Sequence, residues 1–189
     1  HKFNMEVGDG DRKQLMSGTI DRVDICENGT DVYVRIIDYK TGKKDFNIVK
    51  TYYGIDIQLM VYMEAAMKLV AKMRPGKNVI PAGVFYYNIS DPIVSATTES
   101  AEEIEDKIKG ELRLKGMVNS DKDIAEKMDN TEGTSLNIPV SRKADGGFDS
   151  RRSKVMNTEQ FNILGRFVDV RAIDTADRIV GGDIRRSPY

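Results

Sequence analysis

The stretch Ser17–Gly42, SGTIDRVDICENGTDVYVRIIDYKTG, decides the fold because it contains two alternating runs rich in β-branched residues. These runs, Gly18–Glu27 and Thr30–Lys40, flank the pair Asn28-Gly29. Asn-Gly between alternating runs predicts a two-residue type I′ hairpin turn, in which both central residues need a positive φ. The predicted register pairs Glu27 with Thr30, Ile25 with Val32, Asp21 with Ile36, and Thr19 with Asp38.

This register places two acids and a lysine on one face of the hairpin. Opposed residues share a face, as do residues two apart on a strand, so Asp21, Asp38 and Lys40 point the same way. The two acids become diagonal neighbours about 7–8 Å apart, where both can bind one divalent cation such as Mg²⁺. Lys40 then lies beside the scissile phosphate, where it can orient the attacking water and stabilise developing charge. The alternative is an exposed face with a chance ion pair, but Ile36-Ile37 places Asp38 at the end of a core strand.

The two acid motifs, G-x-I-D and I-I-D-Y-K-T-G, resemble the PD-(D/E)xK signature of the RecB-like exonucleases. Within that group, the chain is most similar to the nuclease domain of the AddB (RexB) subunits of bacterial ATP-dependent helicase–nucleases. The resemblance implies an α/β, restriction-endonuclease-like fold with a mixed sheet flanked by helices. The residues that carry it are Gly18, Ile20, Asp21, Arg22, Asp24, Ile37, Asp38, Tyr39, Lys40, Thr41, Gly42, Tyr53, Gly54, Gln58, Leu59 and Tyr62.

The resemblance also implies roles for individual residues. Asp21 and Asp38 would hold Mg²⁺ or Mn²⁺, with the backbone carbonyl of Tyr39 as a third ligand, and Lys40 would be the catalytic lysine. Gln58 and Tyr62 match a Q-x-x-x-Y pair beside the site; the alternative is a polar flank on a half-buried helix. RecB-like nucleases carry an upstream histidine that can join the metal ligands, but the only histidine, His1, stands on an extended segment, so we do not assign it that role.

For the intact assembly, the resemblance implies an AddA/RexA-type helicase–nuclease subunit that feeds single-stranded DNA to this site during double-strand break processing and recombinational repair. AddB-like proteins also carry cysteines that help hold an iron–sulfur cluster. The only cysteine here is Cys26, so we expect no cluster in this fragment and no internal disulfide. The chain contains no Walker A pattern, which excludes the ATP-driven motor. We interpret it as a piece of a larger polypeptide.

The composition is that of one globular domain. The 189 residues are 40% hydrophobic and 31% charged, with a formal net charge of −1. This charge argues against a passive DNA-coating module more than against a nuclease, whose site needs acids. The sequence has no apolar run long enough to span a bilayer and no basic-then-apolar leader, so we expect a cytoplasmic protein.

The pattern of elements around the hairpin predicts a mixed sheet. Lys2–Val7 is a predicted strand that forms a hairpin, through a turn at Gly8–Asp11, with a strand starting near Leu15. A helix is predicted from about Lys50 or Tyr52 to Met73, followed by a buried strand over Pro81–Ile89 that Asp91-Pro92 ends. Strand, strand, helix, strand in this order favours a helix packed across the sheet. The expected buried stripe of the helix is Ile55, Leu59, Met63, Ala66, Val70 and Met73.

After this core, at about residues 15–92, we expect an elaboration over 93–156 and a C-terminal helix over 157–181. The elaboration is predicted to contain helices at Glu99–Lys115 and Lys122–Met128 and an edge strand at Gly133–Ser141. Ile104, Ile108 and Leu112 should face inward from the first of these helices. A capping box at Asn157 and Gln160 opens the last helix. Its predicted buried residues are Phe161, Leu164, Val168, Ala172 and Ile179.

The segment 142–154 is a basic loop that is either a phosphate-contacting flap or a solvated loop. Its basic residues are Arg142, Lys143, Arg151, Arg152 and Lys154. Together these features predict a metal-dependent DNA exonuclease domain. The competing hypotheses are a nuclease-like module that binds DNA or a partner protein without cutting, and a stand-alone exonuclease.

Overall fold

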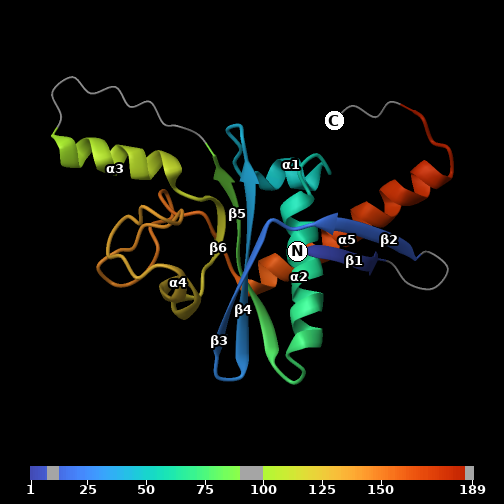
Figure 1. The fold of residues 1–189 in the computed structure, drawn as a ribbon, viewed down its shortest axis with the longest axis horizontal. Coiled ribbons are helices and arrows are strands. Elements are labelled where there is room, and N and C mark those ends of the chain that lie inside the picture. Colours follow the sequence, from blue (N-terminus) through green and yellow to red (C-terminus); the bar gives the residue numbers. More distant parts are fainter. Residues whose placement is uncertain (8–12, 90–99, 186–189) are drawn as a thin grey trace.

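The computed structural model describes residues 1–7, 13–89 and 100–185. Its centre is a five-stranded mixed sheet in the order β3-β4-β5-β6-β7, which confirms the predicted fold class (Figure 1). The pairs β3/β4 and β5/β6 are antiparallel, and β4/β5 and β6/β7 are parallel. The strands are β3 (Arg22–Asn28), β4 (Asp31–Lys40), β5 (Asn78–Asn88), β6 (Lys115–Asn119) and β7 (Val155–Met156).

Helices cover both faces of this sheet. Figure 1 shows α1 (Ile48–Tyr52), α2 (Gln58–Met73) and α5 (Thr158–Val180) on one side, and α3 (Ala101–Leu112) and α4 (Lys122–Met128) on the other. A separate antiparallel pair, β1 (Lys2–Val7) and β2 (Gln14–Thr19), confirms the predicted N-terminal hairpin. The predicted turns at Gly8–Asp11 and Asp91-Pro92 lie outside the described residues. None of the described helices is long and apolar enough to cross a membrane.

The central hairpin forms, but its predicted register is wrong by two residues. Asn28 pairs with Asp31, so Gly29 and Thr30 occupy the turn. Gly29 has a φ of 63° and no other type of described residue has a positive φ, which excludes a type I′ turn centred on Asn28-Gly29. One positive φ at the first central position is the pattern of a type II′ turn. A shift of two preserves the faces, so Asp38 and Lys40 keep the predicted face.

The first run of the hairpin is also divided between two sheets. β2 ends at Thr19 and pairs with β1, whereas β3 begins at Arg22 and pairs with β4. The two residues between these strands therefore leave the regular ladder. Ile20 is one of them and is buried in the core at 2% exposure. Asp21 follows this anchor directly, at the edge of the central sheet.

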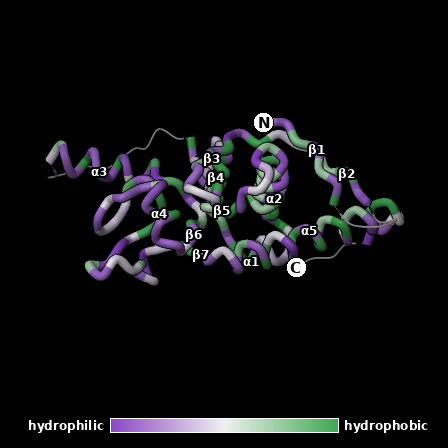
Figure 2. The backbone as a smooth tube through the Cα atoms, turned by 90° about the horizontal axis from the view of Figure 1, so that it is seen from below, coloured by the Kyte–Doolittle hydropathy of each residue, from purple (hydrophilic) through white to green (hydrophobic). Residues whose placement is uncertain are grey.

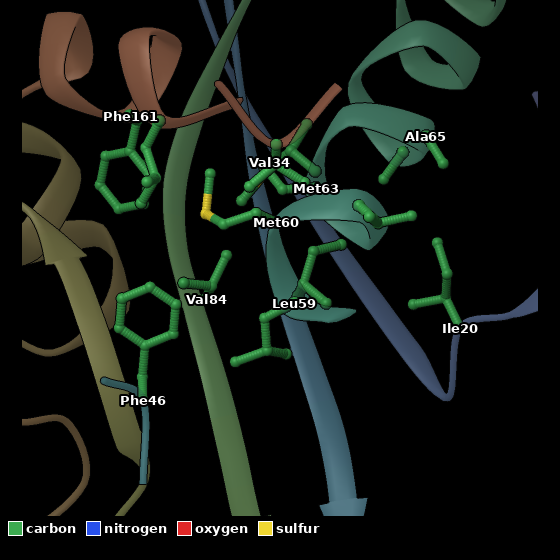
Figure 3. Close-up of a cluster of buried hydrophobic side chains, with 14 of the residues drawn as sticks. Ile20, Val34, Phe46, Leu59, Met60, Met63, Ala65, Val84 and Phe161 are labelled. Atoms are coloured by element: carbon green, nitrogen blue, oxygen red, sulfur yellow. The ribbon is translucent and has the colours of Figure 1, made fainter. Parts of the chain in front are cut away.

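The main core lies between the sheet and the helices α2 and α5. Figure 3 shows Leu59, Met60 and Met63 of α2 facing Val34 of β4 and Val84 of β5. All five side chains are no more than 1% exposed. In Figure 2 the hydrophobic stretches likewise gather where these strands meet α2. Burial of a large apolar side chain stabilises a fold by about 1.5–3 kcal/mol, so this contact fixes α2 on the sheet.

The predicted single helix from about Lys50 to Met73 is in fact two helices. The side chain of Asn47 accepts hydrogen bonds from Val49 and Lys50 and caps α1, which ends at Tyr52, while α2 begins at Gln58. Ile55 falls between them and is 48% exposed, so its predicted burial is wrong. Met73, the last residue of α2, is 52% exposed, so its predicted burial is also wrong.

The second half of the chain differs more from the prediction. α3 projects from the body of the molecule and contains no buried residue, so its Ile104, Ile108 and Leu112 are only partly covered (Figure 1). The predicted strand at Gly133–Ser141 is a loop with an isolated bridge between Thr134 and Ser141. The strand that occurs instead is β6, where a Cβ on Gly116 would lie 2.0 Å from the carbonyl oxygen of Val84. Glycine here permits close backbone approach, although in sequence it argues against a strand.

The remaining helices match their predictions closely. α4 has the predicted bounds, and Asn157 and Gln160 form the predicted capping box of α5. The side chains of Phe161, Leu164, Val168 and Ala172 are buried as expected. Ile179, however, is 72% exposed because the last turns of α5 extend beyond the core.

Asp129 organises the loop that replaces the predicted edge strand. Its carboxylate accepts hydrogen bonds from the backbone of Thr131 at 2.7 Å, Ser135 Oγ at 2.6 Å and Asn137 Nδ2 at 2.9 Å. Burial alone would raise the pKa of Asp129, but these hydrogen bonds outweigh it and lower the pKa to about 2. The ionised carboxylate is therefore part of the folded loop.

We expect Asp129→Asn to lower the free energy of unfolding by about 2 kcal/mol near neutral pH, since one pKa unit corresponds to about 1.4 kcal/mol. Because the folded pKa lies below the ordinary 3.8, the contribution is complete above pH 3.8 and disappears as the pH falls toward about 2. Urea unfolding of both proteins between pH 6 and pH 3 measures the difference. A difference that stays constant or grows on acidification would contradict this account.

Candidate active site

The two predicted carboxylates lie at one end of the β3–β4 pair. Asp38 is near the end of β4 and is only 3% exposed. The observed register ends at the pair Arg22 and Ile37, so Asp21 lies just outside the ladder and does not occupy the predicted diagonal position beside Asp38. Asp21 Oδ2 accepts a hydrogen bond from the backbone N–H of Tyr39 at 2.9 Å. Ile20, buried just before Asp21, anchors this segment in the core (Figure 3).

Asp38, Lys40, Gln58 and Tyr62 form one connected polar network. Lys40 Nζ lies 2.6 Å from Asp38 Oδ2 and donates a 3.0 Å hydrogen bond to Gln58 Oε1. Gln58 Nε2 lies 3.4 Å from Asp38 Oδ1 and donates to Tyr62 Oη at 2.8 Å. The lysine has only donors, so the amide oxygen of Gln58 must face it and the amide nitrogen must face the acid. The first turn of α2 therefore orients both charged groups.

A second buried group adjoins this network and was missed by the sequence analysis. Tyr86, the register partner of Asp38 on β5, donates a 2.7 Å hydrogen bond to Asp56 Oδ1. Asp56 is 6% exposed and also pairs with Lys44 Nζ at 3.0 Å. Burial, reinforced by the Asp56 carboxylate, raises the pKa of Tyr86 far above its ordinary value, so its phenol remains a donor. The available sequence signal was an acid between two isoleucines, at Ile55-Asp56-Ile57.

Tyr86 also contacts the predicted catalytic lysine. Its ring lies 5.7 Å from Lys40 Nζ and 5.1 Å from Lys44 Nζ, measured to the ring centre. Both ammonium groups are therefore within reach of a cation–π interaction with the same ring. Lys40 is held by a carboxylate, an amide oxygen and this ring, and its side chain is still 27% exposed.

Asp38 offers a specific reason to expect a cation. Its Oδ2 atom is buried and accepts no hydrogen bond from the described residues, although Lys40 Nζ lies close to it. The Lys40 ammonium, 2.6 Å away, is the only charge partner of this oxygen among the described residues, and a carboxylate oxygen has a second lone pair that a hard cation could use. The described residues contain no group of three or more His, Cys, Asp or Glu that could hold a metal. The two carboxylates of Asp21 and Asp38 nevertheless fit Mg²⁺ or Mn²⁺, because Mg²⁺ commonly binds through one or two carboxylates and completes its ligands with water and phosphate oxygens.

The five basic residues of the predicted flap separate into different environments. Arg142 donates to the backbone carbonyls of Thr131 and Asp129, which makes it part of the loop structure. Arg152 and Lys154 line a pocket near the end of β5, and Lys154 pairs with Asp45. Lys143 and Arg151 are exposed on the loop.

Comparison with known proteins agrees with this geometry. A family model described as the PD-(D/E)XK nuclease superfamily matches residues 2–189. The chain is also similar to proteins named as the B subunit of an ATP-dependent helicase/deoxyribonuclease. It is 38% identical over 174 residues to that of Thermoanaerobacter sp. (strain X514), which covers 91% of this chain and 15% of the relative. It is 40% identical over 185 residues to that of Caldanaerobacter subterraneus subsp. tengcongensis, covering 97% and 16% respectively.

A third relative, the corresponding protein of Clostridium kluyveri (strain NBRC 12016), is 36% identical over 189 residues, which is 99% of this chain and 16% of the relative. The chain thus spans about one sixth of these relatives. The mixed sheet, with Asp38 and Lys40 at the end of its second strand, is restriction-endonuclease-like. With the family match over nearly its whole length, the chain belongs to the PD-(D/E)XK nuclease superfamily.

Proposed function

We propose that this chain is a metal-dependent exonuclease domain that hydrolyses phosphodiester bonds of DNA. The observation that carries this proposal is the buried Asp38 carboxylate near the end of β4, whose Oδ2 has the Lys40 ammonium at 2.6 Å as its charge partner and accepts no hydrogen bond from another described residue. A buried carboxylate beside a partly exposed lysine, with one lone pair of Oδ2 still open, is an arrangement that a cation and a phosphate can complete.

Asp21 and Asp38 would hold Mg²⁺ or Mn²⁺, with the backbone carbonyl of Tyr39 as a further ligand. When bound, the metal polarises the phosphate and lowers the pKa of a coordinated water. Lys40 donates hydrogen bonds to the attacking water and to the phosphate oxygens on which negative charge develops. Gln58 holds Lys40 and Asp38 at fixed positions through its two amide atoms, and Tyr62 holds Gln58. Gln58 and Tyr62 therefore position the catalytic groups and border the DNA strand.

The relatives' name supports a wider assignment. We propose that the domain belongs to a protein of the AddB (RexB) type that works with an AddA/RexA-type helicase–nuclease partner on single-stranded DNA ends, in the cytoplasm, during double-strand break repair by recombination. The support is the similarity to these helicase/deoxyribonuclease proteins over 91–99% of this chain. An iron–sulfur cluster, if the longer protein has one, would use cysteines outside this sequence, whose only cysteine is Cys26.

The test is Mn²⁺ binding by calorimetry, with single-stranded DNA cleavage assayed in the same samples, for the unchanged chain and Asp38→Ala. We expect the unchanged chain to bind Mn²⁺ and to cut DNA in a reaction that EDTA stops. Asp38→Ala should lose both properties because it removes the buried ligand.

Asp38→Asn is the companion variant, because it keeps the volume of the buried side chain while removing its charge. Circular dichroism and thermal unfolding must show that at least one of the two variants is folded. Equal Mn²⁺ binding by the unchanged chain and the folded variant, or no binding by either, would overturn the metal site.

A further inference from the structure

A basic pocket opens beside the candidate active site and is not explained by the roles assigned so far. It has a volume of about 420 Å³ and lies where β4 and β5 end and β6 begins. Its polar lining has six basic and two acidic side chains. We define the basic pocket by its basic residues: Lys43, Lys44, Arg113, Lys115, Arg152 and Lys154.

Four of the six basic side chains form no ion pair with a carboxylate of the described residues. Lys44 pairs with Asp56 and Lys154 with Asp45. Among the described residues, Arg113 donates to the backbone carbonyls of Ile138 and Val140, at 2.7 and 3.1 Å, and Lys115 donates to the carbonyl of Gly110. These carbonyl contacts fix the two side chains without cancelling their charge.

Lys43 and Arg152 are the least constrained members of the basic pocket. Both are exposed, and neither forms a side-chain ion pair or hydrogen bond with another described residue. The chain as a whole has a formal net charge of −1, so a basic composition does not account for this concentration of cations. A local excess of positive charge of this kind attracts an anion.

Two hydrogen bonds between the Asn88 side chain and the Lys44 backbone connect the basic pocket to the candidate active site. Asn88, the register partner of Lys40, accepts the N–H of Lys44 at 3.0 Å and donates to its carbonyl at 3.1 Å. This double contact holds the segment after β4 against the end of β5. The Lys44 ammonium then shares the Tyr86 ring with Lys40.

The far side of the basic pocket lies on the same face of the sheet. Lys115 of β6 pairs with Tyr86 of β5, which pairs in turn with Asp38 of β4. Directly opposed residues share a face, so the side chain of Lys115 lies on the face that carries Asp38. A strand bound along these ends would thus meet the acid and the basic pocket in succession.

We propose that the basic pocket binds the backbone phosphates of the DNA strand next to the phosphate that is cut. The occupant is a phosphodiester chain because the pocket offers several spaced cations on a fixed frame, and each DNA strand carries about one charge per 3.4 Å along its axis in a duplex. The proposal rests on the proposed function, because it takes the strand held at Asp38 and Lys40 as its ligand. It assigns a role to Lys43, Lys44, Arg113 and Lys115, which lie outside the predicted flap.

The experiment measures binding of a fluorescent oligothymidylate to the chain by anisotropy in EDTA, where no metal is needed. The test variant is Lys43→Glu with Arg152→Glu, because these side chains have no structural partner among the described residues. We expect its affinity to fall at least tenfold. The logarithm of the association constant should fall with the logarithm of the salt concentration, with a slope that is steeper by about 1.4 for the unchanged chain than for the variant. This difference corresponds to the loss of two phosphate contacts on a single strand.

The matched control is Lys72→Glu with Lys127→Glu, which makes the same change in net charge at two exposed lysines, on α2 and α4, that lie outside the basic pocket. We expect less than a threefold loss of affinity for this control. An equal loss in the two double variants would reduce the effect to overall charge and overturn the proposal, as would unchanged affinity in the test variant.

Two further measurements separate the competing explanations. With Mn²⁺ present, the test variant should raise KM for the oligonucleotide and leave kcat within threefold; a loss in kcat alone would contradict a binding role. Anisotropy is measured without metal, so it tests DNA binding independently of cleavage. If the unchanged chain does not cut DNA but the test variant still binds more weakly than the control, the nuclease proposal is wrong and the pocket proposal stands. If polyglutamate binds the unchanged chain and loses affinity in the test variant while DNA does not, the pocket receives an acidic peptide and the proposal is wrong.

Discussion

A Lys40→Ala variant is expected to cut single-stranded DNA about 10²–10³ times more slowly than the unchanged chain, the usual cost of removing one donor that stabilises developing negative charge. The structure holds this ammonium in place through Asp38, Gln58 and the Tyr86 ring, so no other described lysine takes the same position. The measurement is single-turnover cleavage of an end-labelled oligonucleotide in Mn²⁺.

Mn²⁺ binding should respond in the opposite direction. Lys40 Nζ lies 2.6 Å from Asp38 Oδ2, so the lysine and the metal compete for one carboxylate. Calorimetry should therefore show that Lys40→Ala binds Mn²⁺ at least as tightly as the unchanged chain. Lys72→Ala, on an exposed position of α2, serves as the control with unchanged cleavage. If Lys40→Ala cut DNA within tenfold of the normal rate, the lysine would not be catalytic.

Phe161→Ala is expected to lower the free energy of unfolding by about 3–5 kcal/mol, the range for truncating a buried phenylalanine. Phe161 is 1% exposed and belongs to the main core with Leu59 and Met60 of α2 (Figure 3). Its removal leaves a cavity beneath the first turn of α5, which the surrounding side chains fill only in part. Urea denaturation at neutral pH measures the change.

Ile163→Ala is the matched control, because Ile163 lies on the same helix and is 50% exposed. We expect this control to change stability by less than about 0.5 kcal/mol. A loss below about 1.5 kcal/mol for Phe161→Ala would mean that α5 is not required to close the core. Because α2 begins at Gln58, loosening its packing should also weaken cleavage.

The faces of the central hairpin could be predicted from the sequence, but its register could not. Alternation and the D-x-K spacing correctly placed Asp38 and Lys40 on one face, because a face depends only on the parity of the register. The register itself was wrong by two, since Asn28-Gly29 and Gly29-Thr30 both place Gly29 in a tight turn. The order of residues around Gly29 does not by itself reveal which pair is central.

Other features depended on contacts that no local pattern contains. Tyr86 and Asp56 are 30 positions apart and meet only when α2 packs across β4 and β5. The five-residue β6 and two-residue β7 are too short to show alternation, and they form because β5 offers backbone partners to β6, which in turn offers them to β7. By contrast, α4 and α5 were predictable because their hydrophobic periodicity and the capping box of α5 are local.

Apart from Asp21, the polar residues that surround the candidate site come from β4, β5 and the connection between these two strands. A cation bound by Asp38 would therefore be a ligand of the native state of this whole unit and not of one loop. By mass action, a ligand at one hundred times its dissociation constant stabilises the folded state by about 2.7 kcal/mol. The concentration of available metal would then determine how strongly this unit resists unfolding and proteolysis.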